Sequence, residues 1–365
     1  MLLMLALGAT AYTLTPPGAL ARPSPSASSS AQVATELGGM IHFPEYLTSP
    51  GWPEAESALD RLKATLGPRA YVRYDGLWHT WNWDRERPSG YERNARIVGL
   101  LARRGLRSLM VLTPHPWPGS TWDGAPTTRD WGAPKPEWFP AIASRYRDAV
   151  RAYREALRAN GMAEAANAIQ WGNEPASGNP GGNGKLPPGT WSGHALWREL
   201  HRDVSMYGRL QVVAPAYSVL DTPHARVEMA TSRVPGGLDW TAPVDRRAMH
   251  FRHYRPNLAS PTAYAQDYVT ELARRAALVQ ALPFPQGSPS KQASRRDGLW
   301  VTEAYVASGD VPEPRGEAWR RILSRVREGI PGVRVFFAYR FHPAGGPGGL
   351  DWRIPLDAQR PLGTL

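Results

Sequence analysis

Apolar runs of strand length alternate with longer amphipathic segments from residue 37 onward. The runs lie at 39–43, 71–75, 109–113, 169–172, 210–214, 248–251, 298–303 and 333–339. Between them, apolar residues recur every three or four positions at 52–66, 91–104, 137–159 and 262–279, the spacing of a helix that buries one face. Two further sets predict helices after the fourth and seventh runs: Leu196, Leu200, Val204 and Tyr207, then Trp319, Ile322, Leu323, Val326 and Ile330.

Alternating strands and helices predict parallel strand pairing through helical crossovers. Eight such units close a barrel. We therefore expect an α/β fold of the (β/α)8 TIM-barrel type in a single domain, with the last helix short or absent after Asp351. An open doubly wound sheet is the rival architecture, but no glycine-rich phosphate loop follows the first run.

The first 36 residues do not follow this alternation. Residues 1–13 form an uncharged apolar run that is too short for a lasting membrane span. Ala19-Leu20-Ala21 matches a signal peptidase site, although the positively charged start of a signal is missing. We expect a signal peptide at 1–21, a Pro/Ser-rich linker at 22–36 and a catalytic barrel at 37–365. The mature protein is then secreted or held at the cell envelope, with no stable membrane span.

The amino-acid composition limits the kinds of molecule that the protein is expected to bind. The 365 residues include no cysteine, which excludes disulfides and thiolate metal sites. The net charge is +11, but lysine occurs only at Lys63, Lys135, Lys185 and Lys291, and the arginines are spread over predicted helices. This distribution favours solvated helix faces over a nucleic-acid site. We expect a monomer that binds a carbohydrate and no nucleic acid.

Two glutamates end apolar runs that lie far apart in the sequence. Glu174 follows Trp171-Gly172-Asn173 and precedes Pro175, and Glu303 ends the run that starts at 298. In a barrel all strand C-termini open on one face, where sites are built. Two carboxyl groups about 5–5.5 Å apart are the acid/base and nucleophile of a retaining glycosidase.

Neighbouring residues could separate the roles of the two glutamates. Arg73 and Tyr254 are placed to keep Glu303 anionic by charge and hydrogen bonding. The negative charge of Glu303, with burial beside Trp171, would raise the pKa of Glu174 so that it keeps its proton. Asn173 could bind a sugar hydroxyl next to the reacting carbon.

Histidines and tryptophans near strand ends complete the expected sugar site. His115, His250 and His253 are expected to donate to sugar hydroxyls. No H-E-x-x-H pattern occurs, and residues three apart on a strand point to opposite faces, so His250 and His253 do not suit one metal ion. We expect no metal and no cofactor. Trp78 and Trp117 offer flat faces for sugar rings, although loop anchoring is an equal reading for Trp117.

Five short stretches together resemble the clan A glycoside hydrolases, and most of all the xylosidase–iduronidase family (glycoside hydrolase family 39). They are 72–78, 105–117, 171–175, 300–303 and 349–351. The resemblance spans residues 38–351. It implies that Glu174 is the acid/base, that Glu303 is the nucleophile, and that the anomeric configuration is retained. It also places Arg73 and Tyr254 beside the nucleophile and Asn173 at the sugar.

The chain departs from the family pattern in three respects. Clan members often have a tryptophan at the end of the eighth strand, where this chain offers Tyr339 or Phe341. The sixth strand has two histidines, His250 and His253, where the family has a His-x-Tyr pattern. The accessory β-domain of some relatives is missing from this sequence.

The resulting expectation is a retaining β-glycoside hydrolase that cleaves O-glycosidic bonds of a polysaccharide or oligosaccharide by double displacement. A catalytically silent glycan-binding barrel at the cell envelope is the alternative, and a metal-dependent deacetylase is a third. The sugar, the linkage, and endo or exo action stay open.

Overall fold

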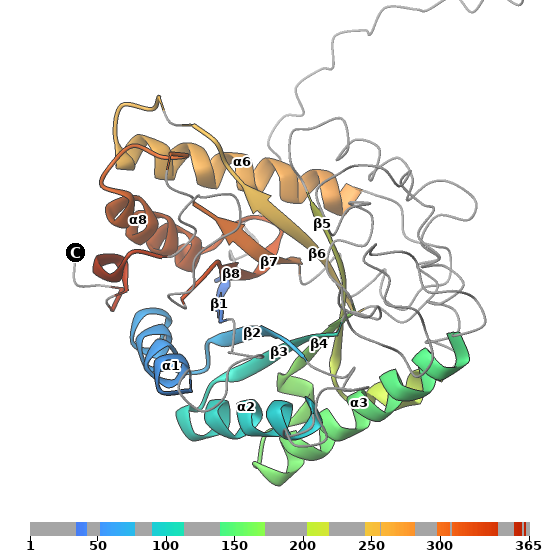
Figure 1. The fold of residues 1–365 in the computed structure, drawn as a ribbon. Coiled ribbons are helices and arrows are strands. Elements are labelled where there is room, and N and C mark those ends of the chain that lie inside the picture. Colours follow the sequence, from blue (N-terminus) through green and yellow to red (C-terminus); the bar gives the residue numbers. More distant parts are fainter. Residues whose placement is uncertain are drawn as a thin grey trace, which may run out of the picture. The chain divides into compact units, whose positions relative to one another are not determined.

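The computed structural model describes residues 34–41, 52–76, 90–112, 139–171, 203–218, 245–255, 257–281, 298–306, 309–341, 354–359 and 361–362. The chain divides into two compact units, residues 1–32 and 33–365, and the elements described below belong to the second. Their strands form one closed barrel, in the order β1 to β8, with every neighbouring pair parallel (Figure 1). The TIM barrel expected from the sequence is confirmed.

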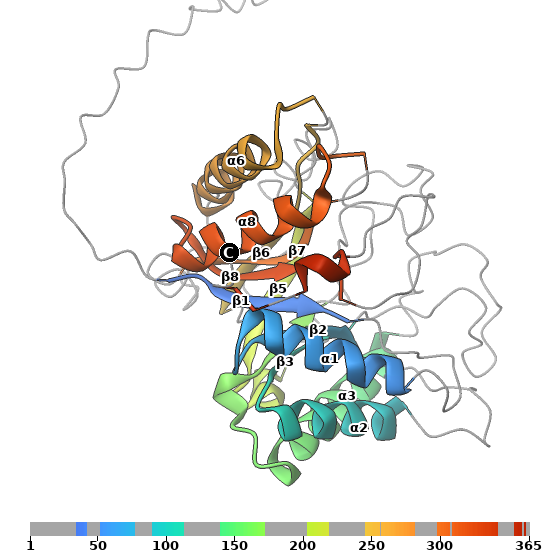
Figure 2. The ribbon, with the colours of Figure 1, turned by 90° about the vertical axis from the view of Figure 1, so that its left-hand side faces the viewer.

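The elements follow the predicted alternation. The strands are β1 (Glu36–Met40), β2 (Tyr71–Asp75), β3 (Arg107–Leu112), β4 (Ala168–Trp171), β5 (Gln211–Ser218), β6 (Arg246–Arg252), β7 (Leu299–Tyr305) and β8 (Val333–Ala338). The α-helices are α1 (Trp52–Leu66), α2 (Gly90–Arg104), α3 (Phe139–Ala159), α6 (Pro261–Ala281) and α8 (Arg315–Glu328). Figure 2 shows α1, α2 and α3 on one flank of the barrel and α6 and α8 on the other.

Apolar side chains are buried in two separate clusters, one on each side of the barrel wall. The larger cluster lies between the strands and the helices and includes Val72 and Trp319. The smaller one fills the barrel interior, where the rings of Tyr71 and Trp300 lie 5.0 Å apart between centroids and Phe337 lies 6.0 Å from Tyr71. Strands buried on both faces explain why the sequence shows continuous apolar runs rather than strict alternation.

Glycine at one position of β1 lets this interior aromatic layer form. A Cβ at Gly38 would lie 2.7 Å from the ring of Phe337, which is closer than van der Waals contact allows. The apolar pattern predicts the first strand at 39–43, but β1 begins at Glu36, because Glu36 and Leu37 already pair with Val335 and Phe336 of β8. The predicted start of this strand was therefore wrong by three residues.

The predicted helix marked by Leu196 to Tyr207 is not continuous. Residues 196–202 lie outside the described part, and Val204–Tyr207 form a separate 3-10 turn, η4. Asp203 precedes this turn in an extended conformation (φ −122°, ψ 93°), and its side chain accepts a hydrogen bond from the Ser205 amide. An aspartate that caps its own short turn stops any helix that arrives from the N-terminal side.

Two other helical turns complete the described elements. They are η3 (Glu164–Ala166), before β4, and η6 (Leu356–Ala358), after β8. Among residues 354–359 and 361–362, η6 is the only helical element, in accord with a last helix that is short or absent. Within the described ranges no helix has the length and apolarity to cross a bilayer. The predicted signal peptide, and the linker up to residue 33, lie outside them.

Candidate active site

Four of the expected site residues come together at the C-terminal ends of the strands. Arg73 lies on β2, His250 on β6, Glu303 on β7, and Tyr339 directly after β8. These strands are distant in sequence, and parallel pairing brings their carboxyl ends to one mouth of the barrel. Of the other expected residues, five lie outside the described part of the chain: Trp78, His115, Trp117, Asn173 and Glu174.

Glu303 and Arg73 form a buried ion pair across the barrel interior. Arg73 Nη1 lies 2.6 Å from Glu303 Oε1, and the two side chains are 0% and 6% exposed. Burial of either the Arg73 or the Glu303 charge alone would cost free energy. Direct contact between the two charges offsets part of that cost. The contact with Arg73 fixes the position of the Glu303 carboxylate at the mouth of the barrel.

Arg73 is held by two more contacts besides Glu303. Its Nε donates to Gln170 Oε1 on β4 at 3.3 Å, and its Nη1 contacts Met40 Sδ on β1 at 2.8 Å. Gln170 in turn donates from Nε2 to Thr302 Oγ1 on β7 at 3.4 Å. Arg73, Gln170 and Thr302 therefore join β2, β4 and β7 in a polar layer above the aromatic one.

A β-bulge in β7 directs Glu303 into the barrel. Trp300 packs in the interior, and strict alternation would send a residue three positions later to the outer face. The β7 register shifts between Val301 and Ala304 on the β8 side, because Thr302 is inserted as an extra residue. Val301 and Ala304 both pack outward, while Thr302 and Glu303 both reach inward. Bulges often re-aim a side chain next to an active site in this way.

His250 is the second neighbour of the Glu303 carboxylate. The strand register places His250 opposite Glu303, and His250 Nε2 lies 3.6 Å from Glu303 Oε1. The His250 ring also packs edge-on against Tyr305, with 6.4 Å between centroids. A 2% exposed imidazole at this position is close enough to orient the carboxylate, or a hydroxyl placed between the two groups.

Tyr339 closes the same mouth from the end of β8. Its ring lies 4.6 Å from that of Tyr305, and Arg340 Nη1 lies 3.5 Å from its hydroxyl. Burial, followed by the negative charge of Glu303, raises the pKa of Tyr339 to about 12. The phenol therefore keeps its proton at neutral pH. Phe341, the other expected residue here, packs outside the barrel against Gly39.

The structure does not bring His253 or Tyr254 together with Glu303. His253 Nε2 lies 2.6 Å from Asp267 Oδ2 on α6, and the ring stacks with Phe251 in the outer layer. Burial lowers the pKa of His253, and contact with Asp267 opposes this shift. Tyr254 is 60% exposed. The physical reason is strand alternation: His250 faces the interior, so His253 faces the helices.

Three residues at this mouth were missed in the sequence analysis. Tyr305 lies two positions after Glu303 and so shares its face, a signal that strand periodicity contains. Gln170 is a buried polar side chain inside an apolar run, which marks it as hydrogen-bonded. Thr302 has no such signal, because its inward direction depends on the bulge. Among the described residues, no cluster of three or more His, Cys, Asp or Glu side chains could hold a metal ion.

Comparison with known proteins rests on solved structures. No family model matches the sequence, and no curated protein matches it. A GH5_18 protein from Streptomyces cattleya, in complex with GlcNAc, superposes with a TM-score of 0.57 at 16% identity, over 90% of this chain and 77% of that one. The chain shares its fold with clan A glycoside hydrolases.

Two further structures agree with this fold. A GH5_18 protein from Bifidobacterium longum superposes with a TM-score of 0.50 at 15% identity, over 84% of this chain and 70% of that one. A family 39 glycoside hydrolase from Bacteroides cellulosilyticus superposes with a TM-score of 0.52 at 12% identity. This chain covers 61% of that longer protein, and the match spans 90% of this chain. At such identities the likeness establishes the fold, and the chemistry must be argued from the site.

Proposed function

We propose that the protein is a retaining β-glycoside hydrolase in which Glu303 is the nucleophile and Glu174 the acid/base. The observation that carries this proposal is the buried pair of Glu303 and Arg73 at the C-terminal mouth of the barrel. A barrel needs no such charge for stability, since its interior is otherwise apolar below this layer. A carboxylate that a bulge directs inward, and that contact with a guanidinium holds in place, is positioned to attack a bound molecule.

In the first step, a Glu303 oxygen attacks the anomeric carbon and the glycosidic C–O bond breaks. The electron pair of that bond goes to the leaving oxygen, which takes a proton from the carboxylic acid of Glu174. The product is a glycosyl ester of Glu303 and a free alcohol. Arg73 compensates the negative charge before the attack, and loses that partner as the ester forms.

In the second step, water attacks the anomeric carbon of the ester and gives its proton to the Glu174 carboxylate. Glu303 leaves as a carboxylate again beside Arg73. Two displacements at the same carbon retain its configuration. Glu174 follows β4 by three residues and lies outside the described part. Its role rests on the Asn173-Glu174-Pro175 triplet and on the resemblance stated above.

The substrate we propose is a β-linked polysaccharide or oligosaccharide outside the cytoplasm. The fold neighbours support the sugar class, since two GH5_18 structures are complexes with GlcNAc and with Manβ1-4GlcNAc. The sequence features at 1–36 support export. The half-buried tyrosines Tyr305 and Tyr339 provide aromatic surface at the mouth where a sugar ring would pack.

The test is chemical rescue of a nucleophile variant. Glu303→Ala should lose at least about 10³-fold in kcat on an aryl β-glycoside, and azide should restore part of the turnover as a glycosyl azide of inverted configuration. Asp267→Ala is the matched control, because it also removes a histidine-paired carboxylate but on the outer face. Undiminished turnover by Glu303→Ala would disprove the assignment. Saccharide binding without turnover by the native protein would support a silent glycan-binding barrel instead.

A further inference from the structure

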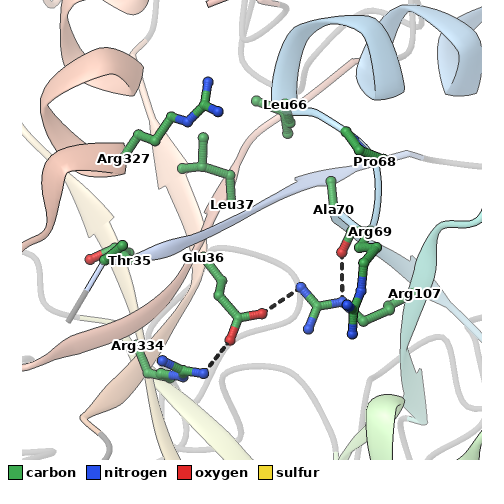
Figure 3. A pocket seen from close by; sticks show the side chains of 11 residues that line it. Thr35, Glu36, Leu37, Leu66, Pro68, Arg69, Ala70, Arg107, Arg327 and Arg334 are labelled. Atoms are coloured by element: carbon green, nitrogen blue, oxygen red, sulfur yellow. Dashed lines mark hydrogen bonds and ion pairs between the residues drawn. The ribbon is translucent and has the colours of Figure 1, made fainter.

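A charged cavity lies at the opposite mouth of the barrel, where the strands begin. It has a volume of about 480 Å³ and is bordered by β1, the turn between α1 and β2, the starts of β3 and β8, and the end of α8. Its lining residues are Ala34, Thr35, Glu36, Leu37, Leu66, Pro68, Arg69, Ala70, Arg107, Arg327 and Arg334 (Figure 3). Pockets of ≈ 300–1,000 Å³ are the size that holds small molecules.

The lining of this cavity is strongly cationic. It contains four arginines and one acidic residue, Glu36. Glu36 lies between Arg107 and Arg334 and pairs with both, at 2.5 Å in the case of Arg334 (Figure 3). In the described part of the chain, neither Arg69 nor Arg327 has an acidic partner. The lining therefore contains one carboxylate and four guanidinium groups, two of which pair with that carboxylate.

The local backbone presents these guanidinium groups at the cavity. Arg69 has a φ of 70°, in the left-handed region that side chains other than glycine seldom adopt. In this conformation the Arg69 carbonyl accepts a hydrogen bond from Arg107 Nε at 2.6 Å (Figure 3). Arg107 is held a second time, because its guanidinium carbon lies 3.8 Å above the centre of the Tyr71 ring. A strained residue that organises a neighbouring charge is a feature found at ligand sites.

Barrel stability alone does not account for this arrangement. The ends of strands at this mouth commonly serve stability, and the pairs of Glu36 with Arg107 and Arg334 fit that role by joining β1, β3 and β8. Two additional arginines without partners add repulsion in a chain that already has a net charge of +11. A bound anion offsets this excess of positive charge and so stabilises the arrangement of arginines.

We propose that this cavity is a binding site for a phosphate-bearing ligand, as the free anion or as a phosphomonoester. Guanidinium groups match phosphate oxygens bidentately, and several of them outweigh the one carboxylate, whose two oxygens are each taken by an arginine. The multiple charge of phosphate suits an excess of three guanidinium groups. The interior aromatic layer of Tyr71, Trp300 and Phe337 separates this site from Glu303. The proposal is independent of the hydrolase function.

Calorimetric titration with inorganic phosphate at constant ionic strength tests the site. Arg69→Gly removes one guanidinium and suits the positive φ, so the variant should fold at least as stably as the native protein. We expect phosphate binding about fivefold weaker in Arg69→Gly and more than about tenfold weaker in Arg69→Gly/Arg327→Gln, which corresponds to about 1.4 kcal/mol. Arg103→Gln is the matched control, because Arg103 is an exposed arginine on α2 away from the cavity.

A variant that should bind phosphate more tightly tests the proposal in the opposite direction. Glu36→Gln frees Arg107 and Arg334 from their carboxylate and should tighten phosphate binding several-fold. Glycerol phosphate, which has the chemistry of a lipid headgroup, is compared with the free phosphate ion. Tighter binding of the ester assigns the site to phosphomonoesters. Tighter binding of the free ion assigns it to inorganic phosphate. The proposal is overturned if phosphate binds no better than chloride, or if Arg103→Gln weakens binding as much as the double variant.

Discussion

The two mouths of the barrel each hold a glutamate between basic groups, yet the two sites differ in burial. At the C-terminal mouth, Glu303 and Arg73 have side chains 6% and 0% exposed. At the N-terminal mouth, Glu36 is 25% exposed, and its partner Arg334 is 36% exposed. The ion pair at the C-terminal mouth is therefore strong, and loss of one partner would be costly. The ion pairs at the N-terminal mouth are weak, because water screens them. Burial decides which glutamate is suited to chemistry and which arginines are available to a ligand.

The largest expected effect comes from Arg73→Met. The substitution leaves the Glu303 carboxylate buried without its cation, which costs about 3–5 kcal/mol of unfolding free energy. Turnover should be lost with it, because the Glu303 carboxylate loses the ion pair that holds it in position. Urea unfolding and kcat measurements check both effects. Arg73→Met/Glu303→Gln should regain stability without activity; a double variant as unstable as the single one would contradict this account.

A smaller effect is expected from Gln170→Leu, which conserves volume and removes the acceptor beside Arg73. Gln170 joins Arg73 to Thr302, and its loss leaves both with one hydrogen bond fewer. We expect kcat to fall about tenfold with little change in KM, which corresponds to about 1.4 kcal/mol of transition-state stabilisation. Gln211→Leu, at the start of β5, should leave kcat unchanged. Equal losses in both variants would mean that Gln170 has no special role.

Removal of the glutamate at the other mouth should affect stability slightly and activity not at all. Glu36→Gln breaks two partly exposed ion pairs, and we expect a loss of about 1 kcal/mol that shrinks in high salt. Turnover should stay within twofold of native, because the aromatic layer lies between Glu36 and Glu303. A large loss of turnover in this variant would show that the two mouths are coupled.

A further effect concerns stability at alkaline pH. In the folded protein the pKa of Tyr339 is raised to about 12, whereas an unfolded tyrosine titrates near 10. The folded state holds the proton longer, so this contribution to stability is complete below pH 10 and is lost as the pH rises through 12. Tyr339→Phe should therefore lose less stability than the native protein between pH 10 and pH 12, as measured by urea unfolding. Parallel losses in the two proteins would refute this.

Part of the candidate active site could be predicted from the sequence, because a parallel barrel brings the ends of its strands together. Arg73 within β2 needed an anionic partner, and Glu303 ended an apolar run, so the eight-strand barrel predicted both at one mouth, whereas their contact also required the bulge in β7. His253 and Tyr254 show the limit of such reasoning. His250 points into the barrel and lies next to Glu303, whereas His253 points outward and contacts Asp267. A strand that is apolar on both faces does not show in its sequence which residues point inward.

What the sequence by itself determined is the order of strands and helices, since periodicity reports which faces are buried. It also indicated the carboxylates that end apolar runs. Only the tertiary structure decided the direction of Glu303, because the bulge at Thr302 arises from pairing with β6 and β8 rather than from local preference. Contacts across the closed interior likewise selected Gln170 and Tyr305. The cationic cavity around Glu36 exists only because β1, β3 and β8 all begin at the same mouth of the barrel.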